Sequence, residues 1–536
     1  MKNIRDGLRK LNYTTPLVAD IHFNPKAAET AARIVEKVRI NPGNLIDPAK
    51  TFQRFEYSDG EYAAEIKRIR ERFIPLLNIC KEHHTAIRIG VNHGSLSDRI
   101  ISRYGDTPFG MVESCMEFLR ICEEQQFKDV VISVKASSTF IMVCTVRLLV
   151  KQMEEENMAY PLHLGVTEAG DGEDGRIKSA VGIGTLLLEG IGDTIRVSLS
   201  EDPELEIPVA HLIIENLKEK ENHLPINGII SPHYHPFSPE RRKTFLAGKV
   251  GKSQVPVVIS DTATGDYRYI GTENPANYPG HSDLIVDAQS YIPKENVHPF
   301  FSFSEIEQWK ICSAELKFFQ LEYVDLTDEV LSLLLQDSQT VIILSSNHMF
   351  SHGEQKAFIH KLWSEKINNP VIIKQSYNES RLESLQVKSA MDCGSFFLDM
   401  LADGIWLCNE NPAISPVDIC SCSFGILQAT GRRISKTEYI SCPSCGRTLF
   451  DLQTTIKKIK DETAHLKGLK IGIMGCIVNG PGEMADADYG YVGAGPGKVS
   501  LYKGKECIEK NIPTDNAVKR LINLIKEYGD WKEVTR

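Results

Sequence analysis

The strongest constraint on the fold is a series of six short β-rich runs that alternate with amphipathic helical stretches between residues 16 and 200. Apolar runs that alternate with helices are typical of parallel strands joined by helical crossovers. Each run ends in polar side chains that are able to bind or react, and the runs occupy residues 16–22, 37–43, 86–92, 130–138, 162–170 and 194–200. The pattern therefore predicts an α/β fold built on a parallel sheet.

The polar strand ends favour a (β/α)8-type barrel over an open doubly wound sheet. In such a barrel the carboxyl ends of the strands converge on one face and build the active site. The candidate substrate-binding residues at these ends are Asp20, His22, Arg39, Asn41, Arg88, Asn92, Lys135, Arg196 and Ser198, and Glu168 is a candidate catalytic carboxylate in the fifth run. Because four of these side chains are cationic, the set predicts a site for a compact anion.

The barrel is expected to be incomplete at the amino end. Six strand–helix units are visible, whereas a closed barrel of this type needs about eight. We expect two units to be absent from the start of this sequence. A misassigned start, a truncation and closure by a later segment remain open as explanations.

The length of the chain predicts several domains, because single hydrophobic cores stop growing near roughly 250–300 residues and this chain has 536. We expect a catalytic barrel domain over 1–205, an α/β barrel-like insert over 206–417 and an α+β domain over 418–536. The insert has apolar runs at 227–232, 256–261, 283–288, 340–346 and 370–376. It has no comparable series of cationic strand ends, so a structural spacer is favoured there.

A possible internal repeat links the first two regions. The fifteen residues from Gly184 align without a gap to those from Gly394, and the matched pairs are Gly184 with Gly394, Leu188 with Leu398, Glu189 with Asp399, Asp193 with Asp403 and Ile195 with Ile405. Chance and duplication explain one such match equally well. In a true duplication, Trp406 and Cys408 would replace Arg196 and Ser198.

Three cysteines in the last region predict a metal site. Cys442 and Cys445 share a Cys-x-x-Cys turn, and Cys476 follows a strand rich in apolar residues. Thiolate ligands favour zinc or an iron–sulfur cluster. A structural zinc site would need a fourth Cys or His close to Cys476, but the nearest capable group is Glu483. Three thiolates with a carboxylate favour a catalytic cluster, and a zinc-dependent hydrolase or a zinc-ribbon binding module is the alternative.

The charge balance excludes some partners. A net charge of −10 argues against a general nucleic-acid binder, which needs a surplus of Lys and Arg. No apolar stretch reaches the roughly 18 residues that suggest a membrane helix, and the first residues lack the apolar core of a leader peptide. The sequence thus predicts a cytoplasmic protein with no membrane and no nucleic-acid partner.

Six motifs in order resemble the 4-hydroxy-3-methylbut-2-enyl diphosphate synthases of the non-mevalonate isoprenoid pathway, in their longer three-domain form. These motifs are "VRINPGN", "IRIGVNHGSL", "VTEAG", "EGIGDTIRVSLSEDP", "CPSCGRT" and "MGCIVNGPGE". The resemblance covers residues 1–205 and 418–536. It implies the reductive ring opening and dehydration of 2-C-methyl-D-erythritol 2,4-cyclodiphosphate to (E)-4-hydroxy-3-methylbut-2-enyl diphosphate, with single electrons from reduced ferredoxin or flavodoxin passing through a 4Fe-4S cluster.

The resemblance also implies roles for individual residues. Cys442, Cys445, Cys476 and Glu483 would be the cluster ligands, and Asn479 would lie beside the cluster and the substrate. Glu168 would donate a proton. Between residues 431 and 470 there are nine Lys or Arg and four Asp or Glu, and this local surplus predicts a docking surface for an acidic electron donor.

Overall fold

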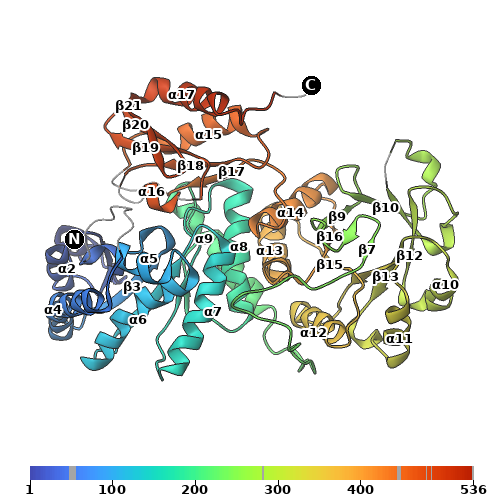
Figure 1. The fold of residues 1–536 in the computed structure, drawn as a ribbon, viewed down its shortest axis with the longest axis horizontal. Coiled ribbons are helices and arrows are strands. Elements are labelled where there is room, and N and C mark those ends of the chain that lie inside the picture. The colour runs from blue at the N-terminus through green and yellow to red at the C-terminus, as the bar shows by residue number, and fades with distance from the viewer. Residues whose placement is uncertain (47–55, 281–282, 444–447, 478–479, 485, 534–536) are drawn as a thin grey trace. The chain divides into compact units, whose positions relative to one another are not determined.

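The computed structural model describes residues 1–46, 56–280, 283–443, 448–477, 480–484 and 486–533 (Figure 1). The chain divides into two compact units. Unit 1 comprises Met1–Gly170, Glu189–Pro203 and Lys436–Arg536, and unit 2 comprises Asp171–Leu188 and Glu204–Ser435. The three domains with boundaries at 205 and 417 stay a prediction, and the two units divide the chain differently.

Unit 1 begins with six parallel strands in chain order, as the alternating pattern predicted. Four of them form one sheet, β1-β2-β3-β4, and β5 pairs with β6. A bridge between Ile132 and Leu162 connects β4 to the start of β5. The strands are β1 (Val18–Ile21), β2 (Lys37–Ile40), β3 (Ala86–Asn92), β4 (Val130–Lys135), β5 (His163–Leu164) and β6 (Thr194–Ile195).

The helices between these strands begin at side chains that cap their amino ends. A capping box of Ser58 and Glu61 starts α4, and Ser138 accepts a hydrogen bond from the backbone N–H of Ile141 to start α7. The helices of this part are α1 (Lys2–Lys10), α2 (Pro25–Ala32), α3 (Pro42–Leu45), α4 (Asp59–His83), α5 (Asp98–Tyr104), α6 (Pro108–Glu124) and α7 (Thr139–Glu155), with the short 3-10 turn η1 (His93–Ser95).

The register of the sheet gathers the polar strand ends. Asp20 lies beside Arg39 and Arg39 lies beside Arg88 across three neighbouring strands. Asn92 lies beside Lys135 on the next pair. Since side chains of residues paired in register project to the same face, one face of the sheet collects these groups.

The carboxyl-terminal part of unit 1 is a five-stranded sheet of order β17-β18-β19-β20-β21. The helices α15 and α17 cover one face through a core that includes Ile456, Leu521 and Tyr491 (Figure 1). A tight turn between Gly495 and Lys498 joins the antiparallel strands β19 and β20. The elements are β17 (Glu438–Ser441), α15 (Leu452–Thr463), β18 (Lys470–Met474), α16 (Gly480–Glu483), β19 (Tyr489–Gly495), β20 (Lys498–Lys503), β21 (Glu506–Pro513) and α17 (Thr514–Glu527).

Unit 2 contains a closed barrel of eight parallel strands, β9 to β16 (Figure 1). The strands are β9 (Val257–Ser260), β10 (Tyr267–Gly271), β11 (Leu284–Asp287), β12 (Val297–Phe301), β13 (Lys317–Leu321), β14 (Thr340–Leu344), β15 (Val371–Tyr377) and β16 (Gly404–Asn409), preceded by the short β7 (Leu246–Ala247) and β8 (Val250–Gly251). The helices are α8 (Gly172–Leu188), α9 (Glu206–Lys218), α10 (Ile306–Ile311), α11 (Asp328–Gln336), α12 (Ser351–Ser364), α13 (Leu382–Leu398) and α14 (Pro416–Ala429).

Unit 2 departs from the sequence expectation in its strand count. The apolar run at 227–232 forms no strand, so that prediction was wrong. The sequence also missed β10, β12 and β13. Their aromatic, proline and polar residues break the plain apolar pattern, and closure of the barrel rather than local composition makes them strands.

The structure favours the internal duplication. Gly184 of α8 and Gly394 of α13 lie where these two helices cross: a Cβ on Gly184 would meet Met391, and a Cβ on Gly394 would meet Val181. In the alignment Met391 corresponds to Val181, so each helix presents the same two positions to the other.

Two further contacts repeat at the matched acidic residues, with donors one position away from an exact match. The Arg147 side chain donates to the Glu189 carboxylate, as the Lys356 side chain does to the Asp399 carboxylate. The Asp193 and Asp403 carboxylates accept backbone N–H groups of Leu162 and Val371, respectively. Chance similarity of fifteen residues would not reproduce these tertiary contacts.

The thiols of Cys115, Cys122 and Cys144 are buried. His233 and His235 lie in an irregular segment with turns. Within the described ranges, no helix combines the length and the apolar character that crossing a bilayer requires.

We predict that Gly184→Ala destabilises unit 2. The new Cβ would lie 2.5 Å from Cγ and 3.1 Å from Cα of Met391, and overpacking of this kind costs about 1–3 kcal/mol. That cost should exceed the gain of up to about 1 kcal/mol in helix propensity, so thermal unfolding should show a lower Tm.

Gly7→Ala is the matched control, because a Cβ on this helical glycine meets nothing within 4 Å. Its Tm should equal or exceed that of the parent. An unchanged Tm in Gly184→Ala would contradict the close crossing of α8 and α13.

Candidate active site

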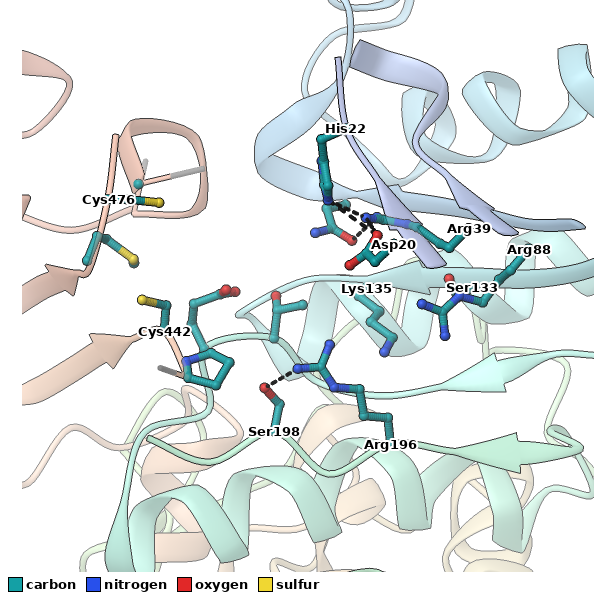
Figure 2. Close-up of a pocket in the computed structure, with 16 residues that line it drawn as sticks. Asp20, His22, Arg39, Arg88, Ser133, Lys135, Arg196, Ser198, Cys442 and Cys476 are labelled. Atoms are coloured by element: carbon teal, nitrogen blue, oxygen red, sulfur yellow. Dashed lines mark hydrogen bonds and ion pairs between the residues drawn. The ribbon is translucent and has the colours of Figure 1, made fainter. Parts of the chain in front are cut away.

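A cavity of about 160 Å³ lies in unit 1 at the carboxyl ends of the first six strands. Figure 2 shows Arg88, Lys135 and Arg196 on one side of it and Cys442 and Cys476 on the other. Its lining consists of Asp20, His22, Arg39, Arg88, Asn92, Ser133, Lys135, Thr167, Glu168, Arg196, Ser198, Cys442, Pro443, Met474, Cys476 and Gly480. At about 30 Å³ per water molecule, a volume of this size suits a small polar metabolite.

Asp20, His22 and Arg39 form a bonded group on one wall. The Nη1 of Arg39 lies 2.9 Å from Oδ1 of Asp20 and 2.8 Å from Nε2 of His22. The Nη2 of Arg39 donates to the carbonyl oxygen of Gly90 at 2.8 Å. Burial alone would raise the pKa of Asp20, but the charge of Arg39 and its hydrogen bond to the carboxylate outweigh burial and hold that pKa well below its usual range.

Three further cations face the cavity, from β3, from β4 and from the end of β6. Lys135 is buried, and Arg88 and Arg196 are half-buried. In the described part of the chain, none of the three forms an ion pair with a carboxylate, and Arg196 donates only to the hydroxyl of Ser198, at 3.3 Å. Charges removed from water cost several kcal/mol each unless a partner compensates them. The arrangement is therefore built for an anionic ligand.

Burial and the repulsion of neighbouring cations lower the pKa values of Arg88 and Lys135. Burial lowers the pKa of Arg88 to about 10, and the charges of Arg39 and Arg196 add to that effect. Burial also holds the pKa of Lys135 well below its usual value, with contributions from Arg196, Arg88 and Arg39. A bound polyanion would reverse both effects, since opposite charges favour the protonated forms.

Two glycines make room for the cationic side chains. A Cβ on Gly90 would lie 2.3 Å from Nε of Arg39 and 3.0 Å from Oγ of Ser133. A Cβ on Gly165 would lie 2.7 Å from the carbonyl oxygen of Arg196 and 3.1 Å from Nζ of Lys135. These close approaches explain why the strands carry no side chain at the two positions.

Glu168 is the carboxylate on the wall opposite Arg39. Its backbone adopts φ of 49°, in the left-handed region, which costs a non-glycine residue on the order of 1–3 kcal/mol and is found mostly at functional sites. The side chain is 8% exposed. The strain holds this carboxylate against the cavity.

The cysteine wall is attached directly to the barrel loops. Ala169 forms a β-bridge with Ser441, and the Ser200 hydroxyl donates to the carbonyl oxygen of Ser441 at 2.9 Å. Cys442 follows Ser441, and its Sγ accepts the backbone N–H of Gly475 at 3.2 Å. The barrel loops thus place the Cys442 thiol beside the cations.

The described donors fit a thiolate-bound metal cluster. Cys442 and Cys476 are half-buried thiols on one cavity wall, and a backbone N–H directed at sulfur is the kind of contact that tunes iron–sulfur clusters. The predicted Cys445 and Asn479 lie outside the described residues. Glu483 ends the short helix α16, and its side chain is likewise outside the description.

Asn41 is the one candidate substrate-binding residue that does not line the cavity. Its Oδ1 accepts the backbone N–H of Gly43 and caps α3, and its Nδ2 donates to Oγ of Ser95 at 2.7 Å. Ser133 and Thr167 were missed by the sequence reasoning, although both lie in the runs that it singled out. The alternation of side chains along β4, which places Ser133 on the face of Lys135, was the available signal.

Parallel barrel strands, an anion-binding cavity at their carboxyl ends and two thiols on its far wall define a barrel enzyme. The family description "GcpE TIM-barrel domain" matches residues 1–211, and "GcpE protein C-terminal domain" matches residues 438–527. The chain therefore belongs to the GcpE family. The barrel fold class expected from the sequence is confirmed.

The similar curated relatives carry one name, 4-hydroxy-3-methylbut-2-en-1-yl diphosphate synthase (flavodoxin). The relative from Parabacteroides distasonis is 61% identical over 98% of this chain and 88% of its own length. Those from Phocaeicola vulgatus and Bacteroides fragilis are 58% and 57% identical, over 99% and 100% of this chain and 88% and 87% of their own lengths. The family resemblance seen in the motifs is thereby confirmed, and the chain is an oxidoreductase of this family.

We predict that Gly90→Ala weakens anion binding. The methyl group would displace the Arg39 guanidinium from its contacts with Asp20 and the Gly90 carbonyl. We expect the Kd for inorganic pyrophosphate, measured by titration calorimetry, to rise about tenfold, or about 1.4 kcal/mol.

Gly60→Ala serves as the control, because a Cβ at this helical position meets nothing within 4 Å. Its Kd should equal that of the parent. Equal affinity in both variants would show that the space over Gly90 is not needed by Arg39.

Proposed function

We propose that this enzyme converts 2-C-methyl-D-erythritol 2,4-cyclodiphosphate to (E)-4-hydroxy-3-methylbut-2-enyl diphosphate. In this reaction a ring C–O bond breaks, two electrons are taken up, one hydroxyl leaves as water and a C=C bond forms. The printed names of the relatives support this assignment. The observation that carries it is the set of three cavity cations without a carboxylate partner in the described residues, Arg88, Lys135 and Arg196.

The cations bind and orient the diphosphate in this proposal. Arg88 and Arg196 present planar guanidinium groups that match phosphoryl oxygens, and Lys135 adds a compact charge between them. Asn92 and Ser198 line the same cavity as neutral donors. Asp20 and His22 lie on the other wall, where the hydroxyl groups of the bound sugar would face them.

Glu168 supplies a proton to the departing oxygen. Its carboxyl group lines the same cavity as the cations and the cysteines, and general acid catalysis requires such a group close to the reacting oxygen. The bridge between Ala169 and Ser441 closes this side of the cavity, which excludes water from the reacting group.

The cofactor in this proposal is a 4Fe-4S cluster held by Cys442, Cys445, Cys476 and Glu483. When bound, it supplies the electrons one at a time. Asn479 would lie beside it, and flavodoxin is the proposed donor because the relatives are named for it. A zinc-dependent hydrolase or zinc ribbon is not favoured, since the curated relatives carry the name of a reductive enzyme.

We predict that the KM for the cyclic diphosphate rises with pH through the titration of Lys135. The pKa of this buried lysine is lowered in the empty site, so it loses its charge as the pH rises through that lowered value, and the affinity for the anion falls. In Lys135→Gln the KM should be higher at neutral pH and should no longer show this rise.

Lys26→Gln provides the control, because Lys26 is an exposed lysine outside the cavity. Its KM should follow the pH dependence of the parent. If Lys135→Gln kept the same pH dependence as well, another group would be responsible for it.

The function is tested by anaerobic purification followed by turnover with the cyclic diphosphate and reduced flavodoxin. We expect a brown protein that contains iron and labile sulfide and releases the open-chain diphosphate. In Glu483→Ala we expect an altered cluster spectrum and a loss of turnover of at least about 100-fold, the usual scale for removing a group needed in the reaction.

Glu506→Ala is the control, since Glu506 is an exposed carboxylate of β21 outside the cavity. It should retain parental turnover. A colourless protein with one bound zinc would refute the proposed function, and full activity of Glu483→Ala would refute the carboxylate ligand.

A further inference from the structure

The segment "INPGN", residues 40–44, contains two buried asparagines that do not line the cavity, Asn41 and Asn44. Asn41 caps α3 and anchors it to Ser95, as described above. A Cβ on Gly43 would lie 1.7 Å from the carbonyl oxygen of Ser95, so α3 and η1 pack backbone to backbone. This rigid attachment fixes the position of the Asn44 side chain.

Asn44 contacts the imidazole ring of His22. The Nδ2 of Asn44 lies 3.2 Å from Nδ1 of His22, and the Nη1 of Arg39 lies 2.8 Å from Nε2 of the same ring. Each ring nitrogen of His22 is therefore within hydrogen-bonding distance of a neighbouring side chain. The protonation of one nitrogen decides which hydrogen bond the other can form.

Arg39 determines the role of Nε2. A guanidinium group carries only donors and stays protonated in proteins. Its N–H directed at Nε2 therefore requires a lone pair there, so the neutral ring carries its proton on Nδ1. Asp20 lies farther from Nε2, at 3.4 Å, and already accepts from Arg39.

A protonated Nδ1 requires an acceptor on Asn44. The oxygen and nitrogen of an Asn amide have nearly the same shape, and hydrogen bonds decide between them. In the orientation with Nδ2 toward His22, the buried Oδ1 has no hydrogen-bond partner among the described residues. A half-turn of the amide loses no hydrogen bond and places Oδ1 against the Nδ1–H of His22.

We propose that Asn44 is a positioning residue that fixes His22 as the tautomer protonated on Nδ1, so that Nε2 acts as a hydrogen-bond acceptor in the cavity. In the empty site Nε2 accepts from Arg39. When the diphosphate engages Arg39, Nε2 accepts from a hydroxyl group of the sugar. This second step rests on the proposed function, whereas the tautomer follows from the contacts alone.

Charged groups surround the ring of His22. Asp20 faces it from β1, Arg39 from β2 and the uncharged Asn44 from α3. Arg88 and Lys135 line the same cavity from β3 and β4.

The tautomer is measured on the whole protein labelled with ¹⁵N-histidine, by long-range ¹H–¹⁵N NMR near neutral pH. The His22 signals are identified by their loss in His22→Gln. We expect a protonated Nδ1 and an unprotonated Nε2 in the parent. A proton on Nε2 in the parent would overturn the proposal without any variant.

Asn44→Asp tests the positioning role, because it keeps the shape and the acceptor but adds a negative charge that stabilises the imidazolium. Both ring nitrogens of His22 should then be protonated where the parent ring is neutral. Asn12→Asp is the matched control: it adds the same charge at an exposed asparagine of unit 1 that does not line the cavity and does not contact His22. Its His22 signals should match those of the parent.

The pH profile of kcat/KM, measured for the same variants, distinguishes a positioning role of Asn44 from a role in folding alone. In Asn44→Asp the acidic limb of the profile should move by about 1–3 pH units toward alkaline pH. At pH values below this limb kcat/KM should fall at least about tenfold, and at pH values above it kcat/KM should return to that of the parent. An equal loss at every pH, or an unchanged profile, would overturn the proposal. If NMR shows the proton on Nδ1 of His22 but the parent does not turn over the cyclic diphosphate, the proposed function is wrong and the assignment of the tautomer is still supported.

Discussion

The repulsion among Arg39, Arg88, Lys135 and Arg196 is the constraint on which unit 1 depends. The parallel register brings these cations to one face, and Asp20 is ion-paired with Arg39. Burial and the repulsion of the neighbouring cations lower the pKa of Lys135. The packing of the barrel must therefore offset the repulsion among the cations, and a bound anion would reduce that repulsion.

The geometry around the cations is set mostly by backbone. Gly90 and Gly165 leave space for the side chains of Arg39 and Lys135, and the bridge between Ala169 and Ser441 brings the cysteine wall to the same cavity. Backbone contacts of this kind move little, so the distances in the site are well defined. Electrostatic preorganisation of a small cavity is what a reaction on a charged substrate requires.

The barrel of unit 2 shares helix crossings and acid-to-backbone contacts with the last part of the first barrel, but not its cations. Its Lys374 packs over the ring of Trp406 at 4.4 Å and donates to Gln320. Trp406 and Cys408 stand where the matched strand of the first barrel has Arg196 and Ser198. The role of the second barrel as a structural spacer stays a prediction.

The sequence by itself determined the parallel α/β class, the six strand ends, the charged residues of the cavity and the cysteine pattern, because each follows from local periodicity and residue type. It could not place Asn41, which caps a helix, or reveal Ser133 and Thr167 as lining residues, because the polar groups of one run look alike. Only the tertiary structure decided that β10, β12 and β13 are strands. It also decided that Gly90 leaves space for the side chain of Arg39 and that Asn44 contacts the ring of His22. These depend on contacts between residues far apart in the chain, for which local sequence carries no signal.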